Sequence, residues 1–385
     1  MTTGAQNPPP AAGEKPAPAP AISTQGLIAA MLDSGQGISD LVFSPGRPPQ
    51  VEKQGQLTPV PFQHLSTLRP DDTARIAGEL LRGNETALRT LKEQGACDLS
   101  YSLPERGRFR VNIFKQRGSF AIVMRVIAGK VPTLAELNLP PVLSEMATLK
   151  NGIVLVTGPT GSGKSSTLAA IIDLINDTRA EHILTIEDPI EFLHYHKKAT
   201  IHQRELHSDT PTFAAALKAA LRQAPKVILV GEMRDRETIE IALTAAETGH
   251  LVFSTLHTID ASKTVDRIIG TFEAGDQQAV RTRLANTFRY VVSQRLVPTK
   301  TSGRAAVLEI LKSTMRTRDY LERGENEGKS LLDAMRDGEL DGMQHFDGEL
   351  EKLLRAGTIS RATALLFATN QGNLQLQIVD IPPDA

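Results

Sequence analysis

The sequence has no tryptophan, only 4% aromatic residues and a single cysteine, Cys97, among 385 residues. One cysteine can form neither a disulfide framework nor a cysteine-based zinc site within a chain, which favours a reducing compartment. No apolar run approaches the roughly 20 residues that a membrane-spanning helix requires. The first residues also lack the charged and then apolar segments of a signal peptide. We therefore expect a cytoplasmic protein that works at a membrane only through partners.

An excess of charge of one sign is also missing, because 43 lysines and arginines face 44 aspartates and glutamates. The net charge therefore provides no large basic field for binding nucleic acid, and no basic patch carrying aromatic residues is evident. We expect no nucleic-acid partner. The hydrophobic fraction of 40% is sufficient for buried cores, and the length predicts two or three domains.

Composition divides the chain into four segments. Residues 1–22 are rich in proline and alanine and have almost no bulky apolar side chains, so we expect a disordered or polyproline-like tail. Residues 23–130 mix strand and helix patterns and predict an α+β domain. Residues 131–150 contain three prolines and predict a linker with a short helix. Residues 151–385 predict a second folded domain.

The α+β domain is predicted from two kinds of periodicity. Residues 71–93 have the apolar spacing of a helix, whereas residues 97–127 are typical of strands. In the segment RFRVNIF, apolar residues fall on one face of a strand, and Arg108 and Arg110 fall on the other. The sheet of this domain should therefore have an outer face that is unusually rich in arginine.

The second domain alternates apolar strands with helices from Asn151 onward. Its strands are nearly continuous apolar runs, such as GIVLVTG and KVILVGE, which suits a parallel sheet covered by helices on both faces. We therefore predict an α/β fold for this domain. From Lys263 to the end, we predict a mostly helical region.

A glycine-rich loop follows the first strand of this domain and matches the pattern G-x-x-x-x-G-K-[ST] from Gly158 to Ser165. The glycines let backbone N–H groups surround a phosphate, and the following helix adds its positive N-terminus. Lys164 should reach the β- and γ-phosphates, and the Ser165 hydroxyl should bind Mg²⁺. The pattern predicts binding of ATP and Mg²⁺ by Gly158, Pro159, Thr160, Gly161, Ser162, Gly163, Lys164, Ser165 and Ser166.

Two acidic residues end neighbouring apolar strands and are candidate catalytic groups. Glu187 ends the segment HILTIE, and Glu232 follows KVILVG. Strand carboxyl ends are where open α/β sheets place their catalytic groups. Many P-loop enzymes have aspartate where Gly231 stands, so Glu232 either supports the metal ion or polarises the attacking water. The sequence alone does not divide these roles between Glu187 and Glu232.

Two histidines bracket a further apolar strand, HLVFSTLH. His250 begins this segment and His257 ends it. A single histidine at a strand end is usually an ordinary polar residue, but two of them around a buried strand favour a sensor of the γ-phosphate or of a neighbouring subunit. A zinc site is not indicated, because further ligands are missing at usable spacing.

These elements, in this order, resemble the secretion ATPase superfamily. Its motifs are Walker A, an Asp box, an unusual Walker B in which glycine precedes the glutamate, and a His box. The block from Gln223 to Thr258 is similar to the retraction ATPases of type IV pili, the PilT and PilU group. The resemblance extends over about residues 23–380, including RGRFRVNIFKQRGSF, NLPPVL, VVSQRLVP and GMQHFD.

The resemblance implies a PAS-like N-terminal domain, a RecA-like P-loop ATPase core and assembly into a homohexameric ring. It further implies that arginines of the N-terminal domain reach the nucleotide phosphates. Arg108, Arg110 and Arg125 match those positions. A cationic side chain there would neutralise charge that develops on the transferred phosphoryl group.

The implied function is a hexameric motor that hydrolyses ATP to retract pili through an inner-membrane platform protein. A paralogous retraction ATPase is a further candidate partner. One alternative is a pilus-assembly or type II secretion ATPase, but those relatives usually carry a four-cysteine metal element that this chain cannot form. Another is an accessory nucleotide-binding subunit of the retraction motor.

Two segments bear on the choice between a main motor and an accessory subunit. TRDYLERGENEG departs from the helical motif of the main motor, and HYHKKATIHQREL is closer to PilU.

Overall fold

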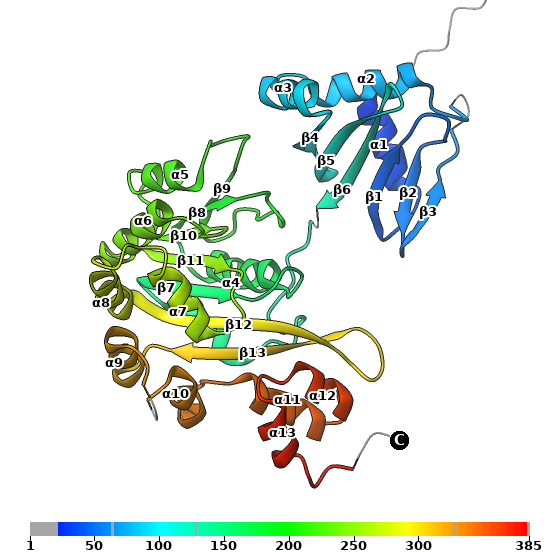
Figure 1. Cartoon of the computed structure of the whole chain (residues 1–385). Helices are drawn as coiled ribbons and strands as arrows, with labels where there is room; N and C mark the ends of the chain where they lie inside the picture. Colours follow the sequence, from blue (N-terminus) through cyan, green and yellow to red (C-terminus); the bar gives the residue numbers. More distant parts are fainter. Residues whose placement is uncertain (1–21, 63–64, 128, 327–328, 383–385) are drawn as a thin grey trace, which may run out of the picture. The chain divides into compact units, whose positions relative to one another are not determined.

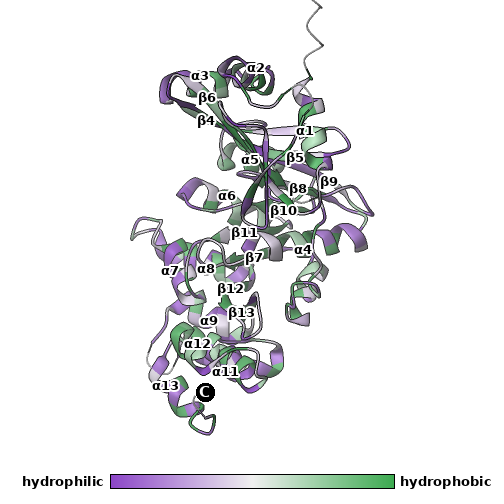
Figure 2. Ribbon diagram, turned by 90° about the vertical axis from the view of Figure 1, so that its right-hand side faces the viewer, coloured by the Kyte–Doolittle hydropathy of each residue, from purple (hydrophilic) through white to green (hydrophobic). Residues whose placement is uncertain are grey.

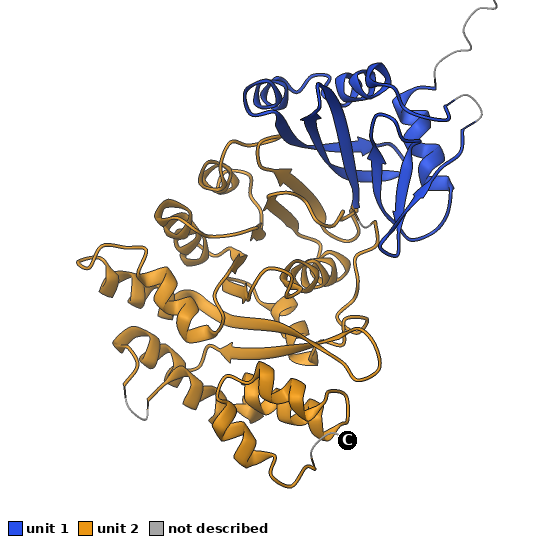
Figure 3. Cartoon of the chain, turned by 45° about the vertical axis from the view of Figure 1, so that its right-hand side comes forward, with its two compact units in different colours: residues 1–126 blue, residues 127–385 orange. Residues whose placement is uncertain are grey.

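The computed structural model describes residues 22–62, 65–127, 129–326 and 329–382. The chain forms two compact units, Met1–Val126 and Ile127–Ala385 (Figure 3). Apart from Ile22, the predicted tail lies outside the described residues. Within the described ranges, no helix is both long enough and apolar enough to cross a bilayer.

Unit 1 contains a six-stranded sheet in the order β3-β2-β1-β6-β5-β4 (Figure 1). Its elements in chain order are α1 (Thr24–Asp33), β1 (Ile38–Phe43), β2 (Gln50–Lys53), β3 (Gln56–Pro59), α2 (Pro70–Leu80), α3 (Glu85–Gln94), β4 (Ala96–Leu103), β5 (Gly107–Gln116) and β6 (Ser119–Ile127). The alternation predicted for β5 is confirmed, because Phe109, Val111 and Ile113 are fully buried whereas Arg110 is exposed.

The helical pattern predicted over residues 71–93 is interrupted in the structure. Two separate helices, α2 and α3, replace one continuous helix. Asn84 caps the start of α3 by accepting a hydrogen bond from the Ala87 amide at 2.9 Å. An asparagine at this position satisfies an amide that would otherwise lack a partner, so it favours a helix start over a continuous helix. Leu88, an apolar residue of the segment predicted as one helix, is 41% exposed.

Unit 2 contains a sheet with the strand order β13-β12-β7-β11-β10-β8-β9 among the described residues. All of its neighbouring strands run parallel except β13, which pairs antiparallel with β12. Its elements are η1 (Pro141–Thr148), β7 (Gly152–Thr157), α4 (Lys164–Thr178), β8 (His182–Glu187), β9 (Thr200–Glu205), α5 (Phe213–Ala220), β10 (Val227–Val230), α6 (Arg236–Glu247), β11 (Leu251–Leu256), α7 (Ala261–Ile269), α8 (Gln277–Thr287), β12 (Phe288–Pro298), β13 (Arg304–Lys312), α9 (Met315–Arg323), α10 (Leu331–Asp337), η2 (Glu339–Asp341), α11 (Phe346–Arg355), α12 (Arg361–Phe367) and α13 (Gln371–Gln377).

Helices cover both faces of this sheet, as the continuous apolar strands predicted. Val154 and Val156 of β7 pack with η1 and α4 on one face, whereas Ile153 and Leu155 pack with α6, α7 and α8 on the other. Hydrophobic residues accordingly gather along the central strands in Figure 2. The predicted linker 131–150 is part of this packing, because its apolar side chains, including Leu143 and Met146, are buried in the α4 layer.

The prediction of a mostly helical chain after Lys263 is wrong for residues 288–312. These residues form the long strands β12 and β13, which extend the sheet beyond β7. The strand pattern of β12 is obscured because the polar residues Ser293 and Gln294 are buried in it rather than exposed. Strand β9, which pairs with β8, was also not expected.

Candidate functional site

The glycine-rich loop lies between β7 and α4 and forms a narrow cradle. Gly158 has φ 142°, a value that only glycine adopts readily. The buried Lys164 folds back into the loop, where its Nζ donates to the carbonyl oxygens of Gly158 at 2.8 Å and Pro159 at 3.0 Å. Burial lowers the pKa of Lys164, while the charge of Glu232 raises it. The cationic group is thus held where phosphate oxygens would enter.

Strand β12 supports the cradle through hydrogen bonds of two residues that were not predicted as part of the site. The Thr157 hydroxyl donates to the Ser293 hydroxyl at 3.0 Å, and the Thr167 hydroxyl donates to Gln294 Oε1 at 2.8 Å. Ser293 and Gln294 are buried. Buried polar side chains need hydrogen-bond partners. Two adjacent polar residues within an otherwise apolar segment could therefore have indicated that this segment contacts the site.

Glu232 and His257 come together at the same edge of the sheet as the cradle. The Glu232 Oε2 lies 2.8 Å from Arg234 Nη2 and 3.6 Å from His257 Nε2. The charge of Glu232 also acts on Lys164, so this carboxylate lies within electrostatic range of the lysine of the glycine-rich loop. The structure therefore brings together three of the predicted site residues, which follow three different strands, β7, β10 and β11.

Gly231 allows the end of β10 to approach β8 closely. The Gly231 amide donates to the Ile186 carbonyl oxygen at 2.7 Å. A Cβ atom at position 231 would lie 3.2 Å from that oxygen and 3.4 Å from the Glu187 Cα. The first of these contacts is tighter than ordinary packing, so an aspartate at this position would require the end of β8 to shift by a few tenths of an ångström.

Glu187 has a different environment from Glu232. Its Oε1 accepts hydrogen bonds from the Thr185 hydroxyl at 2.6 Å and from Gln203 Nε2 at 3.1 Å. Burial raises the pKa of Glu187, while these two hydrogen bonds oppose the rise. Glu187 is therefore held by neutral donors, whereas Glu232 faces the cationic groups.

The structure corrects the prediction that His250 binds nucleotide. Strand β11 runs parallel to β7, and the His250 carbonyl oxygen accepts from the Gly152 amide, at the end of β7 away from the cradle. The His250 ring instead contacts the Ala245 carbonyl oxygen at 2.9 Å. Only His257 lies at the carboxyl end of β11, because parallel strands present the same end to one edge of the sheet.

The predicted arginines belong to unit 1. Arg110 lies on the exposed face of β5, and Arg108 is half-buried beside Ser102, 3.4 Å from its hydroxyl. Arg125 forms an ion pair with Asp40 at 3.0 Å, yet 71% of its side chain is exposed. All three arginines therefore belong to the sheet of unit 1, and their contact with phosphates stays a prediction.

A pocket of about 310 Å³ lies beside the cradle. It is lined by Pro159, Thr160, Gly161 and Ser162 of the cradle together with Ile259, Arg295, Leu296, Arg304 and Phe367. Arg295 is fixed there, because its guanidinium lies 3.7 Å from the centre of the Phe346 ring and donates to the Phe367 carbonyl oxygen at 2.8 Å. The pocket combines apolar walls with two cationic side chains.

A buried carboxyl group, Glu309 of β13, lies near Arg295. It accepts a hydrogen bond from the Ala261 amide at 2.7 Å. The pKa of Glu309 is raised to about 7, chiefly by burial; Asp260 and Asp347 add to the rise, while the Ala261 hydrogen bond and Arg295 oppose it. The folded protein therefore holds this proton to a higher pH than the unfolded chain does.

This raised pKa predicts a loss of stability as pH rises. The contribution of Glu309 to the free energy of unfolding is fully present below pH 4.5, its ordinary pKa. This contribution is lost as pH rises towards 7. At 1.36 kcal/mol per pKa unit the loss is about 3 kcal/mol. We expect Glu309→Gln to remove that part of the decline, measured as the free energy of unfolding by urea at pH 5 and pH 8. Equal declines in the wild type and the variant would contradict this prediction.

The residues present fit a magnesium ion that arrives with a nucleotide. The part of the chain that the structure describes holds no group of three or more histidine, cysteine, aspartate or glutamate residues that could bind a metal by themselves. Ser165, exposed in the first turn of α4, and Glu232 supply oxygen atoms, the ligand type that Mg²⁺ prefers together with substrate phosphates.

Comparisons with known proteins show the family of the chain. The Type II/IV secretion system protein family matches residues 99–344. The type IV pilus retraction ATPase PilT of Pseudomonas aeruginosa is 43% identical over 329 residues, which cover 86% of this chain and 94% of PilT. The type IV pilus ATPase PilU of the same species is 40% identical over 354 residues, 91% of this chain and 90% of PilU.

A solved structure agrees with the fold as well. The crystal structure of the pilus retraction motor PilT with bound ADP has a TM-score of 0.80 and 39% identity, covering 91% of this chain and 98% of that chain. The phosphate cradle, the acidic strand ends and these likenesses lead to one conclusion. The chain is an ATPase of the Type II/IV secretion system protein family and belongs to its type IV pilus retraction ATPases.

Proposed function

We propose that this protein is a hexameric motor that hydrolyses ATP to power retraction of a type IV pilus. The observation that carries the proposal is the convergence of Lys164, Glu232 and His257 at one sheet edge. We place the motor at the cytoplasmic face of the inner membrane, where it acts on a platform protein of the pilus machinery.

Each residue at the sheet edge has its own role in phosphoryl transfer in this proposal. The cradle and Lys164 hold the β- and γ-phosphates, since backbone amides and a cation stabilise the charge there. Ser165 and Glu232 would hold Mg²⁺, which would supply positive charge against the phosphates. Glu232 polarises the attacking water, and Glu187, at the adjacent strand end, orients water at the same edge. His257, beside Glu232, senses the γ-phosphate.

We further propose that Arg108, Arg110 and Arg125 act on the nucleotide phosphates in the assembled ring. Arg110 and Arg125 are exposed, and cationic side chains can stabilise the charge of a transferred phosphoryl group. The Asp40 carboxylate would hold Arg125 in a fixed direction through its ion pair.

The test of retraction is a deletion strain complemented with the wild type or with Glu232→Gln. The deletion and the Glu232→Gln strains should carry long, abundant pili that do not retract, and the wild-type gene should restore twitching. Loss of pili in the deletion strain would point instead to an assembly ATPase.

An accessory role is the second candidate, because the chain is 40% identical to the type IV pilus ATPase PilU and 43% identical to PilT. In that case the purified ring would bind ATP but depend on a paralogous retraction ATPase for pilus retraction. Twitching that persists in the deletion strain while the paralogue is present would favour the accessory role.

We assign the pocket beside the cradle to the base and ribose of the nucleotide. Phe367 offers an aromatic wall, so Phe367→Ala should weaken ATP binding roughly 10-fold while the affinity for inorganic tripolyphosphate stays unchanged. Leu366→Ala, the exposed neighbour, is the matched control. Equal losses for both ligands, measured by calorimetric titration, would contradict this assignment.

A further inference from the structure

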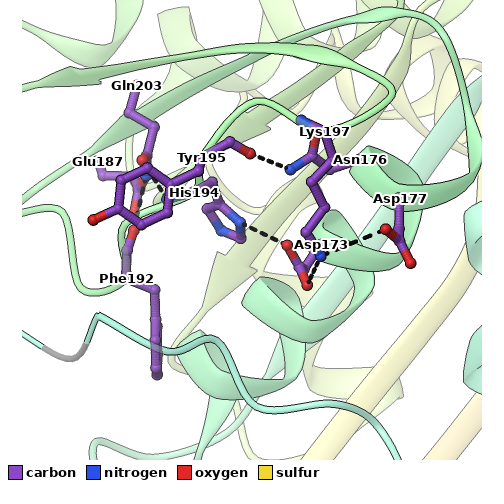
Figure 4. A network of polar contacts seen from close by, with 9 residues as sticks. All are labelled: Asp173, Asn176, Asp177, Glu187, Phe192, His194, Tyr195, Lys197 and Gln203. Carbon is purple, nitrogen blue, oxygen red and sulfur yellow. Dashed lines mark hydrogen bonds and ion pairs between the residues drawn. The ribbon is translucent and has the colours of Figure 1, made fainter.

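Gln203 of β9 connects three groups through its single amide. Its Nε2 donates to Glu187 Oε1 at 3.1 Å and to the Phe192 carbonyl oxygen at 2.9 Å, and its Oε1 accepts from the His194 amide at 2.9 Å (Figure 4). A reversed amide would place its oxygen against two acceptors and its NH₂ group against a donor. The contacts therefore fix the orientation of the Gln203 amide.

Two side chains donate hydrogen bonds to the same oxygen of Glu187. The Thr185 hydroxyl and the Gln203 amide both donate to Oε1. Hydrogen bonds donated to a carboxylate favour its charged form, which burial disfavours. Gln203 thus both directs the carboxylate and helps to keep it ionised.

The segment between β8 and β9 is attached to α4, the helix that begins at the phosphate cradle. The fully buried Asn176 donates from Nδ2 to the Tyr195 carbonyl oxygen at 2.7 Å and accepts at Oδ1 from the Lys197 amide at 3.2 Å (Figure 4). Asp173 adds an ion pair with Lys197 at 2.9 Å and lies 3.7 Å from His194 Nδ1.

These attachments restrict the backbone groups that Gln203 itself contacts. His194 and Phe192 lie in the same segment, and both bind the Gln203 amide. A side chain locked by such surrounding contacts can hold a catalytic group in one geometry. Helix α4 therefore supports both the cradle, at its start, and the segment that orients Glu187, near its end.

We propose that Gln203 is a positioning residue for the ATPase reaction, which holds the Glu187 carboxylate at the sheet edge through a segment anchored to α4. This inference rests on the proposed function. It assigns no contact between Gln203 and the nucleotide. Its predicted effect therefore lies in turnover rather than in nucleotide affinity.

The test compares Gln203→Met and Gln203→Glu with the wild-type ring. Methionine keeps the length of the side chain and removes its hydrogen bonds, so kcat should fall roughly 10-fold while KM stays within about twofold. Glutamate replaces the donor by an acceptor and should reduce kcat further. Thr200→Ala, an exposed position on the same strand, is the control and should keep the wild-type kcat.

The dependence of kcat on pH separates positioning from a general structural effect. Without the Gln203 donor, the charged form of Glu187 is less favoured, so the acid limb of the profile should move to higher pH. Glu191, the other charged group that acts on Glu187, is unchanged in both variants. A lower kcat with an unchanged pH profile would overturn the proposal.

Glu187→Gln distinguishes the failure of the inference from that of the proposed function. If Glu187→Gln loses turnover but Gln203→Met keeps the wild-type kcat and profile, the inference is overturned and the proposed function stands. If the wild-type ring hydrolyses no ATP, the proposed function fails and the inference fails with it. Nucleotide affinity and the unfolding curve of each variant establish that it is folded.

Discussion

Glu232→Gln is expected to lower ATP turnover at least about 100-fold while nucleotide affinity stays within about threefold of the wild type. The carboxylate lies beside His257 and within electrostatic range of Lys164. Glutamine keeps the shape but removes the charge that polarises water and supports the metal ion. Steady-state phosphate release and titration with a fluorescent nucleotide measure the two quantities.

The control for this variant is Glu237→Gln, at an exposed position in the first turn of α6. It should turn over ATP at the wild-type rate. The stability of Glu232→Gln should change by less than about 1 kcal/mol, because the ion pair that is lost joins Glu232 to an exposed Arg234. Wild-type turnover in Glu232→Gln would remove Glu232 from the mechanism.

Gly158→Ala should lower the free energy of unfolding by at least about 3 kcal/mol and abolish nucleotide binding. The residue has φ 142°, where alanine is strained. A Cβ atom would also lie 2.3 Å from the Gln294 carbonyl oxygen and 2.7 Å from the Ser162 hydroxyl. Because the first of these is backbone of β12, the strand beneath the cradle would have to move. Urea unfolding and nucleotide titration measure both effects.

Gly161→Ala is the matched control within the same loop. Gly161 also has a positive φ, of 79°, but a Cβ atom there would meet nothing within 4 Å. Only the backbone strain remains, so the free energy of unfolding should fall by about 1 kcal/mol. Similar losses in the two variants would mean that the contact with β12 contributes nothing to the cradle.

Local patterns predicted the parts of the fold whose residues alternate or repeat without interruption. The apolar runs of β7, β10 and β11 and the buried face of β5 are confirmed. Strand β12 was not predicted, because its residues Ser293 and Gln294 are polar yet buried beside the cradle. Their hydrogen-bond partners are distant in sequence, and no local pattern reveals such partners.

The sequence alone did not distinguish the positions of the two histidines or the surroundings of the two glutamates. His250 and His257 bracket one strand symmetrically, and only the parallel direction of β11 beside β7 places His257 alone at the cradle. Glu187 and Glu232 both follow apolar strands, but their neighbours differ. Gln203 binds the first, whereas Arg234 and His257 face the second.

The sequence by itself determined the phosphate cradle, the parallel α/β core and the resemblance to retraction ATPases. These depend on contiguous residues, whose spacing is fixed by the chain. The tertiary structure decided how β12 supports the cradle, which histidine faces it and how each glutamate is held. Those properties depend on strand order and on contacts between distant residues, such as Thr157 with Ser293 and Glu187 with Gln203.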